Sequence, residues 1–217
     1  MTKGELRNAL DQRISTSKVS GFWTTAMRDE WINTAGQAVA SFRKWPFLEL
    51  ALVTTSDGTE YYPYPKGPVE FQYNSIYNLK VDGETYPGKD GRDRVKWNTF
   101  RQEKELGSNR KIFANHNGFY FLHPVPAEGV EISIYGIRAW KELVNDSDEP
   151  ITPETLDEPI IRTALATCLR KAKRYSEAQV EMNDIFNPQM GMLINIWNQY
   201  EEEGAQGFGG QTRSTRW

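Results

Sequence analysis

The stretch from Ile151 to Tyr200 constrains the fold of this chain more than any other part of the sequence. Apolar side chains recur there at steps of three and four residues, which is the spacing of one face of an α-helix. The two series at this spacing, apolar except for Gln189, are Ile160, Ile161, Ala164, Leu165, Cys168, Leu169, Ala172 and Tyr175, and then Met182, Ile185, Phe186, Gln189, Leu193, Ile196, Trp197 and Tyr200. This pattern predicts a helical hairpin.

Capping residues predict where the two helices of the hairpin begin. Thr152-Pro153-Glu154 offers an N-cap with proline at the first helical position. Ser176, with Gln179 three residues later, has the spacing of a capping box. Ordering about 40 residues costs roughly 1–2 kcal/mol each, whereas burying about ten large apolar side chains returns roughly 1.5–3 kcal/mol apiece. The hairpin therefore needs partners elsewhere in the chain or on another copy of it.

Two apolar series near the N-terminus can supply such partners. Thr2 and Glu5 form a candidate capping box at the start of the first series, and the second ends by Trp45, because the following proline disfavours helix. The apolar positions are Leu6, Ala9, Leu10 and Ile14, and then Trp23, Met27, Trp31, Ala35, Ala38, Val39 and Phe42. We therefore expect an antiparallel helical bundle built from residues 1–46 and 145–203.

Residues 47–144 have the composition of an inserted antiparallel β domain. Leu48 to Thr55 and Phe71 to Val81 are rich in β-branched and aromatic residues. Three dipeptides suit the turns of β-hairpins, namely Asp57-Gly58, Asp82-Gly83 and Asn117-Gly118. Phe119, Phe121, Val130, Ile132 and Ile134 alternate with more polar neighbours, as in a half-buried sheet. The fold class predicted for the whole chain is α+β.

The charged segment from Thr85 to Lys111 is weakly patterned. We predict a mobile excursion there, with a short helix around Thr99 to Leu106.

Composition excludes several classes of protein. A net charge of −3 argues against a protein that coats nucleic acid, and no apolar run approaches the roughly 20 residues of a membrane helix. The N-terminus lacks the apolar core of a signal peptide, and the single cysteine, Cys168, is read as a core residue of a protein made in a reducing cytoplasm.

Recognisable catalytic and cofactor chemistry is absent from the sequence. His116 and His123 are too few for most metal sites, and both are interpreted as structural or solvated residues. Asp146-Ser147-Asp148-Glu149 lacks the glycine and the distal glutamate of a calcium loop, so we read it as a capped turn entering the helical hairpin. We expect no cofactor, no metal and no enzymatic activity.

The C-terminal residues 204–217 change in character. A glycine-rich run that contains Phe208 is followed by Arg213, Arg216 and Trp217. Either this is a frayed end, or it is an extended arm that orders on a partner, with the aromatic residues as anchors and the arginines as ion-pairing groups. We favour the arm.

A second candidate contact surface lies on the helical hairpin. The basic face includes Arg162, Arg170, Lys173 and Arg174. Such a face could touch phosphate, but more often it is solvated or salt-bridged, here to Glu181 and Asp184 of a neighbouring copy. The exposed apolar residues Val180 and Ile194 also favour burial beyond a monomer. The residues proposed for a subunit interface are Arg162, Arg170, Arg174, Val180, Glu181, Asp184 and Ile194.

The order of these parts resembles that of the adaptor proteins of tailed bacteriophages, also called head-completion or head-to-tail connector proteins. Trp45 to Leu48 leads into a strand with Thr54-Thr55. Asn117 to Pro126, followed by Gly129 to Tyr135, is similar to the family's strand, Pro-x-Pro turn and strand. Pro150 to Pro153 then opens the helical hairpin. The shared order of these motifs carries the resemblance. The Pro63 to Pro68 segment departs from the simpler turn of the family.

The resemblance implies a structural virion protein at the head–tail junction, made in the host cytoplasm. Such adaptors assemble as rings, typically of 12 copies, beneath the portal protein. They extend the DNA channel and give a tail or nozzle protein a docking surface, and DNA passes without sequence-specific binding. The mild acidity of this chain suits a channel through which DNA slides. No membrane contact is implied.

Two other classes of protein remain as alternatives. A β-rich carbohydrate- or surface-binding module with helical flanks would stack sugar rings on Tyr61, Tyr62, Tyr64, Tyr73 and Tyr77. Such a module needs these rings in solvent on one sheet face, whereas an adaptor buries many of them. A cell-wall enzyme is disfavoured, because no catalytic set can be recognised.

Overall fold

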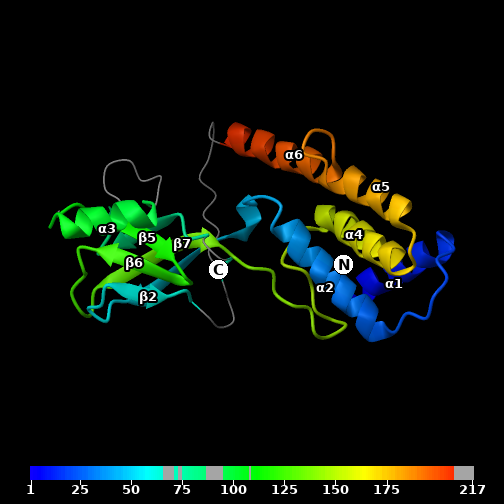
Figure 1. The fold of residues 1–217 in the computed structure, drawn as a ribbon, viewed down its shortest axis with the longest axis horizontal. Helices are drawn as coiled ribbons and strands as arrows, with labels where there is room; N and C mark the ends of the chain where they lie inside the picture. The colour runs from blue at the N-terminus through cyan, green and yellow to red at the C-terminus, as the bar shows by residue number, and fades with distance from the viewer. Residues whose placement is uncertain (66–70, 73–74, 87–94, 108, 208–217) are drawn as a thin grey trace. The chain divides into compact units, whose positions relative to one another are not determined.

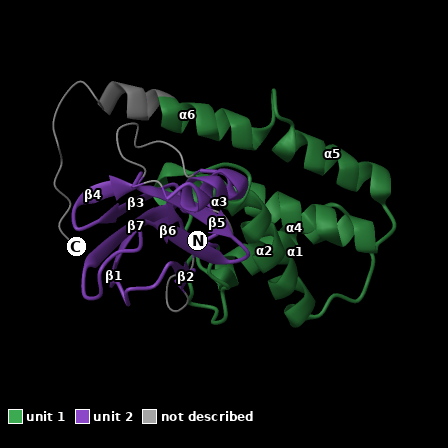
Figure 2. Cartoon of the chain, turned by 60° about the vertical axis from the view of Figure 1, so that its left-hand side comes forward, with its two compact units in different colours: residues 1–47, 140–217 green, residues 48–139 purple. Residues whose placement is uncertain are grey.

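The computed structural model describes residues 1–65, 71–72, 75–86, 95–107 and 109–207. The chain divides into two compact units, one of residues 1–47 and 140–217 and the other of residues 48–139 (Figure 2). The described residues form six α-helices and two antiparallel sheets, which confirms the predicted α+β class.

The first unit is helical. Its α-helices are α1 (Lys3–Thr16), α2 (Thr25–Ala40), α4 (Asp157–Lys171), α5 (Tyr175–Phe186) and α6 (Met192–Gly207). Helix α4 contacts α1 and α2, and it also contacts α5, which in turn contacts α6 (Figure 1). Because α4 is covered from both directions, Thr163 and Ala166 are buried although they lie opposite the predicted apolar stripe.

The N-terminal helices begin with side-chain caps. The capping box at α1 is confirmed, since the Glu5 backbone N–H donates to Thr2 Oγ1 at 3.3 Å and the Thr2 N–H donates to Glu5 Oε2 at 2.7 Å. Helix α2 begins at Thr25, where the Met27 N–H donates to Thr24 Oγ1 at 3.2 Å. The apolar series predicted for this helix begins at Trp23, and the cap at Thr24 explains why the helix starts after that residue.

Two predicted starts in the C-terminal hairpin are wrong. A short 3₁₀ turn, η2 (Glu154–Leu156), intervenes after Pro153, and α4 begins at Asp157. Helix α5 begins at Tyr175, after Lys173 with a φ of 63°, and no side chain caps it. Ser176 and Gln179 form no capping box, because both already lie inside the helix.

The second helix of the predicted hairpin is two helices, α5 and α6. Helix α5 ends at Phe186, and Asn187 Oδ1 accepts the backbone N–H groups of Gln189 and Met190 at 2.9 and 3.2 Å. A Cβ on Gly191 would lie 2.6 Å from the carbonyl oxygen of Ile185, so the tight return into α6 requires glycine. Proline at position 188 cannot donate a helical hydrogen bond, which explains the break.

The second unit consists of two sheets and one helix. The strands are β1 (Glu49–Thr55), β2 (Tyr61–Pro63), β3 (Asn78–Val81), β4 (Glu84–Tyr86), β5 (Ile112–His116), β6 (Phe119–His123) and β7 (Glu131–Ile137). One sheet has the order β1-β7-β3-β4 and the other the order β2-β6-β5. Helix α3 (Trp97–Glu105) confirms the short helix predicted near Thr99, while residues 87–94 and 108 of that segment lie outside the described residues.

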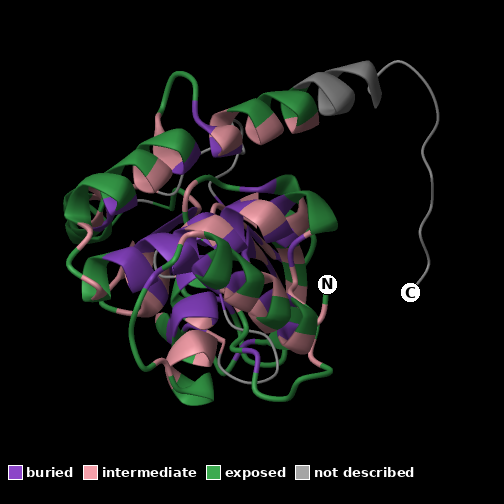
Figure 3. Cartoon of the chain, turned by 90° about the vertical axis from the view of Figure 1, so that its right-hand side faces the viewer, coloured by how far each residue is buried: buried purple, intermediate pink, exposed green. Residues whose placement is uncertain are grey.

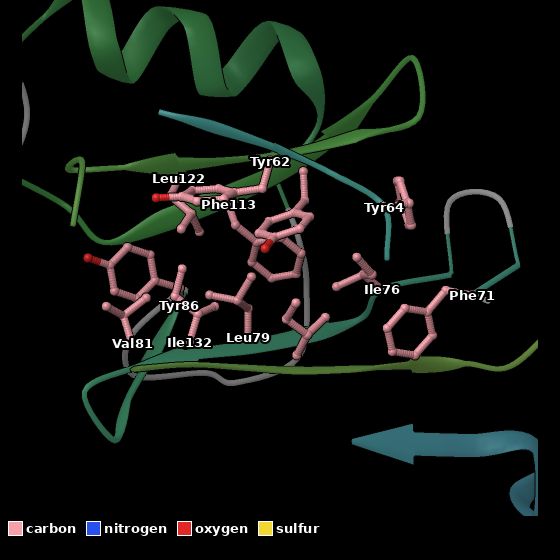
Figure 4. Packing of buried hydrophobic residues seen from close by; sticks show 12 residues of the cluster. Tyr62, Tyr64, Phe71, Ile76, Leu79, Val81, Tyr86, Phe113, Leu122 and Ile132 are labelled. Atoms are coloured by element: carbon pink, nitrogen blue, oxygen red, sulfur yellow. The ribbon is translucent and has the colours of Figure 1, made fainter. Parts of the chain in front are cut away.

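The main core of this unit contains residues from both sheets, and Figure 4 shows their side chains packed together. It contains Tyr62, Tyr64, Phe71, Ile76, Leu79, Val81, Tyr86, Phe113, Tyr120, Leu122, Ile132 and Ile134. A second, smaller cluster joins α3 to the other face of β5 and β6 through Phe100, Ile112 and Ala114.

Strand β6 contributes to both clusters, and this corrects one sequence expectation. Tyr120 and Leu122 point into the main core, whereas Phe121 packs on the cluster under α3. The alternation at Phe119 and Phe121 was therefore assigned to the wrong face. Because α3 covers the second face, aromatic residues occur on both sides of this strand.

Two of the three predicted hairpin turns are confirmed. Asp82-Gly83 joins β3 to β4 with φ values of 51° and 75°, and Asn117-Gly118 joins β5 to β6 with φ values of 48° and 77°. Asp57-Gly58 does not close a hairpin, because β1 pairs with β7 and β2 pairs with β6. Instead the buried Ser56 hydroxyl hydrogen-bonds the Tyr62 hydroxyl at 2.8 Å, where the chain passes from one sheet to the other.

Candidate assembly surfaces

Arginine side chains of the predicted basic face connect α4 to its own chain. Arg162 donates from Nε to Glu181 Oε2 at 2.6 Å and from Nη2 to Asp184 Oδ2 at 2.9 Å. Burial lowers the pKa of Arg162, but the hydrogen bonds to these two carboxylates outweigh it and raise the pKa overall. The carboxylates were assigned to a neighbouring copy, yet the structure pairs all three groups within one chain.

Arg174 is also engaged within its own chain, whereas Arg170 is exposed. Arg174 donates to the backbone carbonyl of Ser17 at 2.7 Å and to Glu177 Oε1 at 2.6 Å. The hydrogen bond from Arg174 lowers the pKa of Glu177. Among the predicted interface arginines, Arg170 is therefore the one whose side chain faces solvent.

Apolar side chains are exposed on the outer helices of this unit. Val180 on α5 is 59% exposed, and Met190, in the turn between α5 and α6, is 76% exposed. Ile194 on α6 is half-buried. Figure 3 shows that the side of α5 and α6 that faces away from the other helices is largely exposed. Val180 is thus exposed as the sequence predicted, whereas Ile194 is only partly accessible, and the exposed Met190, within the break at Pro188, was missed.

An aromatic cluster fixes α6 to the segment that follows α2. Trp45 is fully buried, and its indole N–H donates to the carbonyl of Val39 at 3.0 Å. The ring of Trp45 lies 5.4 Å from those of Phe47 and Trp197, measured between centroids, and 6.3 Å from that of Tyr200. This cluster therefore anchors the last described element before the predicted arm.

Helix α6 ends at Gly207, so residues 204–207 continue the helix although the sequence assigned them to the arm. The arm residues Phe208, Arg213, Arg216 and Trp217 lie outside the described residues. The predicted arm is accordingly shortened to residues 208–217.

The acidic turn at residues 146–149 closes on the start of α1. Asp148 Oδ2 accepts the backbone N–H groups of Asn145 and Val144 at 2.8 and 2.7 Å, which lowers the pKa of Asp148. The carbonyls of Asp146 and Asp148 accept the N–H groups of Gly4 and Lys3 at 3.0 and 2.8 Å. The turn is capped as predicted, but it satisfies the first turn of α1 instead of opening the hairpin.

An ion-pair network beside this turn was not predicted. The buried Lys3 Nζ lies 3.1 Å from Asp29 Oδ2 and 2.5 Å from the carbonyl oxygen of Val144. Arg7 bridges Asp29 and Asp146, at 3.0 and 2.7 Å, and the hydrogen bond from Arg7 lowers the pKa of Asp146. The first turns of α1, Asp29 in α2 and the acidic turn at Asp146 are far apart in the sequence, so no local sequence pattern predicts the network.

The reactive residue types occupy structural positions. Cys168 is buried in α4, as predicted, and burial raises the pKa of its thiol to about 11. His116 is half-buried, with its ring stacked 4.4 Å from that of Trp97, so its interpretation as a solvated turn residue is wrong. No group of His, Cys, Asp and Glu among the described residues could hold a metal ion.

The tyrosines distinguish the adaptor from the sugar-binding alternative. Tyr62 and Tyr64 are buried in the main core of the second unit, and among the described tyrosines of the set only Tyr61 is more than half exposed. Tyr77 is half-buried, where burial and the nearby Glu49 raise its pKa to about 12. Tyr73 lies outside the described residues. The four described rings do not form the single solvated face that stacking on sugars requires.

Comparison with known proteins agrees with the residues quoted for the adaptor resemblance. The family model described as SU10 adaptor protein matches residues 1–213. No curated protein sequence matches the chain. Within the described residues, none of the helices has the length and apolarity needed to cross a membrane. The match covers nearly the whole chain, and the protein therefore belongs to the SU10 adaptor protein family of bacteriophage structural proteins.

Proposed function

We propose that this protein forms a ring that joins the portal to the tail of a bacteriophage and extends the DNA channel. The family match over residues 1–213 is the observation that carries the proposal. The ring is built from the helical bundle of residues 1–46 and 145–203 and the inserted β domain of residues 47–144. Twelve copies are the expected number, and DNA passes without sequence-specific contact.

Exposed apolar side chains support association beyond a monomer. In the helical unit Phe22, Val144, Tyr175, Val180 and Met190 are each more than half exposed. Arg170 and Ile194 add a solvent-facing cation and a half-buried apolar side chain. Burial of such residues between copies removes apolar surface from water, at roughly 25 cal/mol for each Å². We assign these residues to contacts between subunits or with the tail protein.

The arm of residues 208–217 is proposed to order on a partner in the assembled particle. Phe208 and Trp217 are large aromatic residues, and Arg213 and Arg216 are cations that pair well with carboxylates. Helix α6, which immediately precedes the arm, is held by the Trp45 cluster. The helix therefore fixes the point from which the arm departs.

Electron microscopy of the purified protein, alone and with the portal protein of the same phage, tests this function. We expect closed rings that stack coaxially on the portal. A variant that ends at Gly207 should stay folded but fail to join DNA-filled heads, because its arm is missing. A protein that remains monomeric and does not bind portal would contradict the proposal, and truncated protein that still joins heads would contradict the role of the arm.

A further inference from the structure

Among the described strands, β1 is paired along one edge alone. It pairs with β7 along its whole length, from Glu49 opposite Ile137 to Thr55 opposite Glu131. Within the sheet order β1-β7-β3-β4 it is therefore a border strand, as Figure 2 shows. The opposite border strand, β4, has three residues, whereas β1 has seven.

The register shows which backbone groups face outward. On the β7 side of the residues that flank β1, the Leu48 carbonyl accepts from the Arg138 N–H, and the Ser56 N–H donates to the Val130 carbonyl. Because bonding direction alternates along an antiparallel strand, the even-numbered residues of β1 face β7. The odd-numbered residues present their N–H and C=O groups to the other side. Those residues are Glu49, Ala51, Val53 and Thr55.

These outward groups are unoccupied as far as the described residues are concerned. All four residues are exposed, and none of their backbone N–H or C=O groups on that side is bonded within the described parts of the chain. Val53 is 65% exposed. Soluble proteins usually protect such an edge with lysine, proline or a bulge, because an open edge pairs with another chain. Strand β1 contains neither lysine nor proline, and its pairing with β7 has no bulge.

A cavity lies beside the inner face of this edge. It has a volume of about 520 Å³ and is lined by Leu52, Thr54, Tyr62, Pro63, Tyr120 and Ile134, among others. Leu50 and Leu52 point inward and pack on the main core. A strand added to β1 would place every second side chain in line with Leu52, next to this cavity. The edge therefore offers backbone pairing together with a pocket for a bulky side chain.

We propose that the free edge of β1 binds residues 208–217 of a second copy of this chain as an added antiparallel or parallel strand. This inference rests on the proposed function, because it names the surface on which the arm orders. Within the arm, residues 211–217 match the seven residues of β1 in length and contain no proline or acidic residue. Thr212 and Thr215 favour extended backbone, and Trp217 is large enough to fill a pocket.

Charge also favours this occupant. Asp57, Glu128 and Glu131 are exposed around the Thr55 end of β1, where the Cβ of Glu128 lies 3.5 Å from the position of a Cβ on Gly58. The arm contributes Arg213 and Arg216 and no carboxylate side chain. Pairing arginine with carboxylates at the border of an interface steers association and fixes register. An acidic edge thus meets a basic strand.

Cysteine cross-linking between two co-expressed populations tests the contact directly. One population carries Val53→Cys, and the other carries a single cysteine at 211, 212, 213, 214 or 215. Cys168 is buried and does not compete. Added-strand pairing predicts dimers that alternate in yield along the arm, because successive side chains point to opposite faces. Equal yields at all five positions, or no cross-linked dimers, would overturn the proposal.

Val53→Pro provides a second test. It deletes an outward N–H that takes no part in pairing with β7, so the isolated fold should tolerate it. Its matched control, Val53→Ala, shortens the same side chain but keeps the N–H. We expect Val53→Pro to raise the protein concentration needed for ring assembly about tenfold, and Val53→Ala to raise it by less than about threefold. Equal effects of the two variants, with both proteins folded by circular dichroism, would refute the backbone pairing.

The outcome separates this inference from the proposed function. Rings that form and bind portal without any cross-link from Val53→Cys would refute only the β1 contact. Absence of both rings and portal binding would refute the proposed function itself.

Discussion

A substitution at Gly36 tests the packing of the helical unit, because two opposing effects meet there. Gly36 is buried in the interior of α2, where replacement by alanine normally stabilises a helix by about 1 kcal/mol. A Cβ at this position, however, would lie 2.2 to 2.5 Å from three ring atoms of Trp140. Carbon atoms prefer a separation of about 3.5–4.0 Å, so the indole has to move by more than about 1 Å.

That displacement has a definite cost. Trp140 donates from its indole N–H to Asn33 Oδ1 at 3.3 Å, and Asn33 in turn holds the backbone N–H and C=O of Leu143 at 2.8 and 3.1 Å. Overpacking costs about 1–3 kcal/mol, and a weakened hydrogen bond about 1 kcal/mol. After the helical gain is subtracted, we expect Gly36→Ala to destabilise the protein by about 1–3 kcal/mol.

A double-mutant cycle with Trp140→Leu gives the decisive comparison. In that background the obstructing ring is gone, so Gly36→Ala should stabilise the protein by about 1 kcal/mol. Urea unfolding monitored by circular dichroism measures both differences, and in thermal melts each kcal/mol corresponds to about 2–4 °C for a chain of this size. If Gly36→Ala stabilises the wild-type chain, or has the same sign in both backgrounds, the steric reasoning is refuted.

Three further predictions concern the aromatic cluster, the acidic turn and the arm. Trp45→Ala should cost about 3–5 kcal/mol in urea unfolding, because the ring is fully buried; an equal cost for the half-exposed Trp197→Ala would contradict this ranking. The N–H groups of Asn145 and Val144 lower the pKa of Asp148, so its carboxylate stabilises the fold above the ordinary carboxyl pKa, and this contribution is lost as pH falls through the lowered value. The melting temperature of wild type should therefore exceed that of Asp148→Asn at pH 7 and converge with it as pH falls below the lowered pKa of Asp148, and a constant difference across pH would refute the assignment. Trp217→Ala should weaken attachment to its partner more than Arg213→Ala in a binding titration, because a buried aromatic anchor outweighs a peripheral charge, and equal losses would contradict the anchoring role.

Local sequence signals predicted those parts of the fold that local physics decides. The capping box of Thr2 and Glu5 and the positive φ values at Asp82-Gly83 depend on neighbouring residues alone, and both were found. The break between α5 and α6 was missed, although Pro188 and Gly191 marked it. The apolar period runs through the break, because Ile185 before it and Leu193 after it are both buried. Periodicity therefore records a buried face and not the continuity of a helix.

The candidate surfaces could be predicted only in part, because the sequence does not show whether a charged side chain pairs within its own chain or with a neighbouring copy. Arg162 reaches Glu181 and Asp184 because α4 and α5 are antiparallel and adjacent, a register fixed by the turn at Lys173. From the sequence alone, pairing within a chain and pairing between copies satisfy the same charges equally well. The exposed apolar residues were easier to identify, because Val180 lies off the period of the buried face.

Strand β1 shows what sequence patterns omit even where the strand itself is predicted correctly. Its alternation places Leu50 and Leu52 inward, but the sequence cannot tell whether one or both edges are paired, because that depends on β7, about 80 residues later. Pairing on one edge alone leaves four exposed residues whose outward backbone groups have no partner among the described residues. In a protein that acts as a monomer, such an edge carries a risk of aggregation without benefit. In a subunit of an assembly, the same edge is a specific site that is filled only when the partner strand is present.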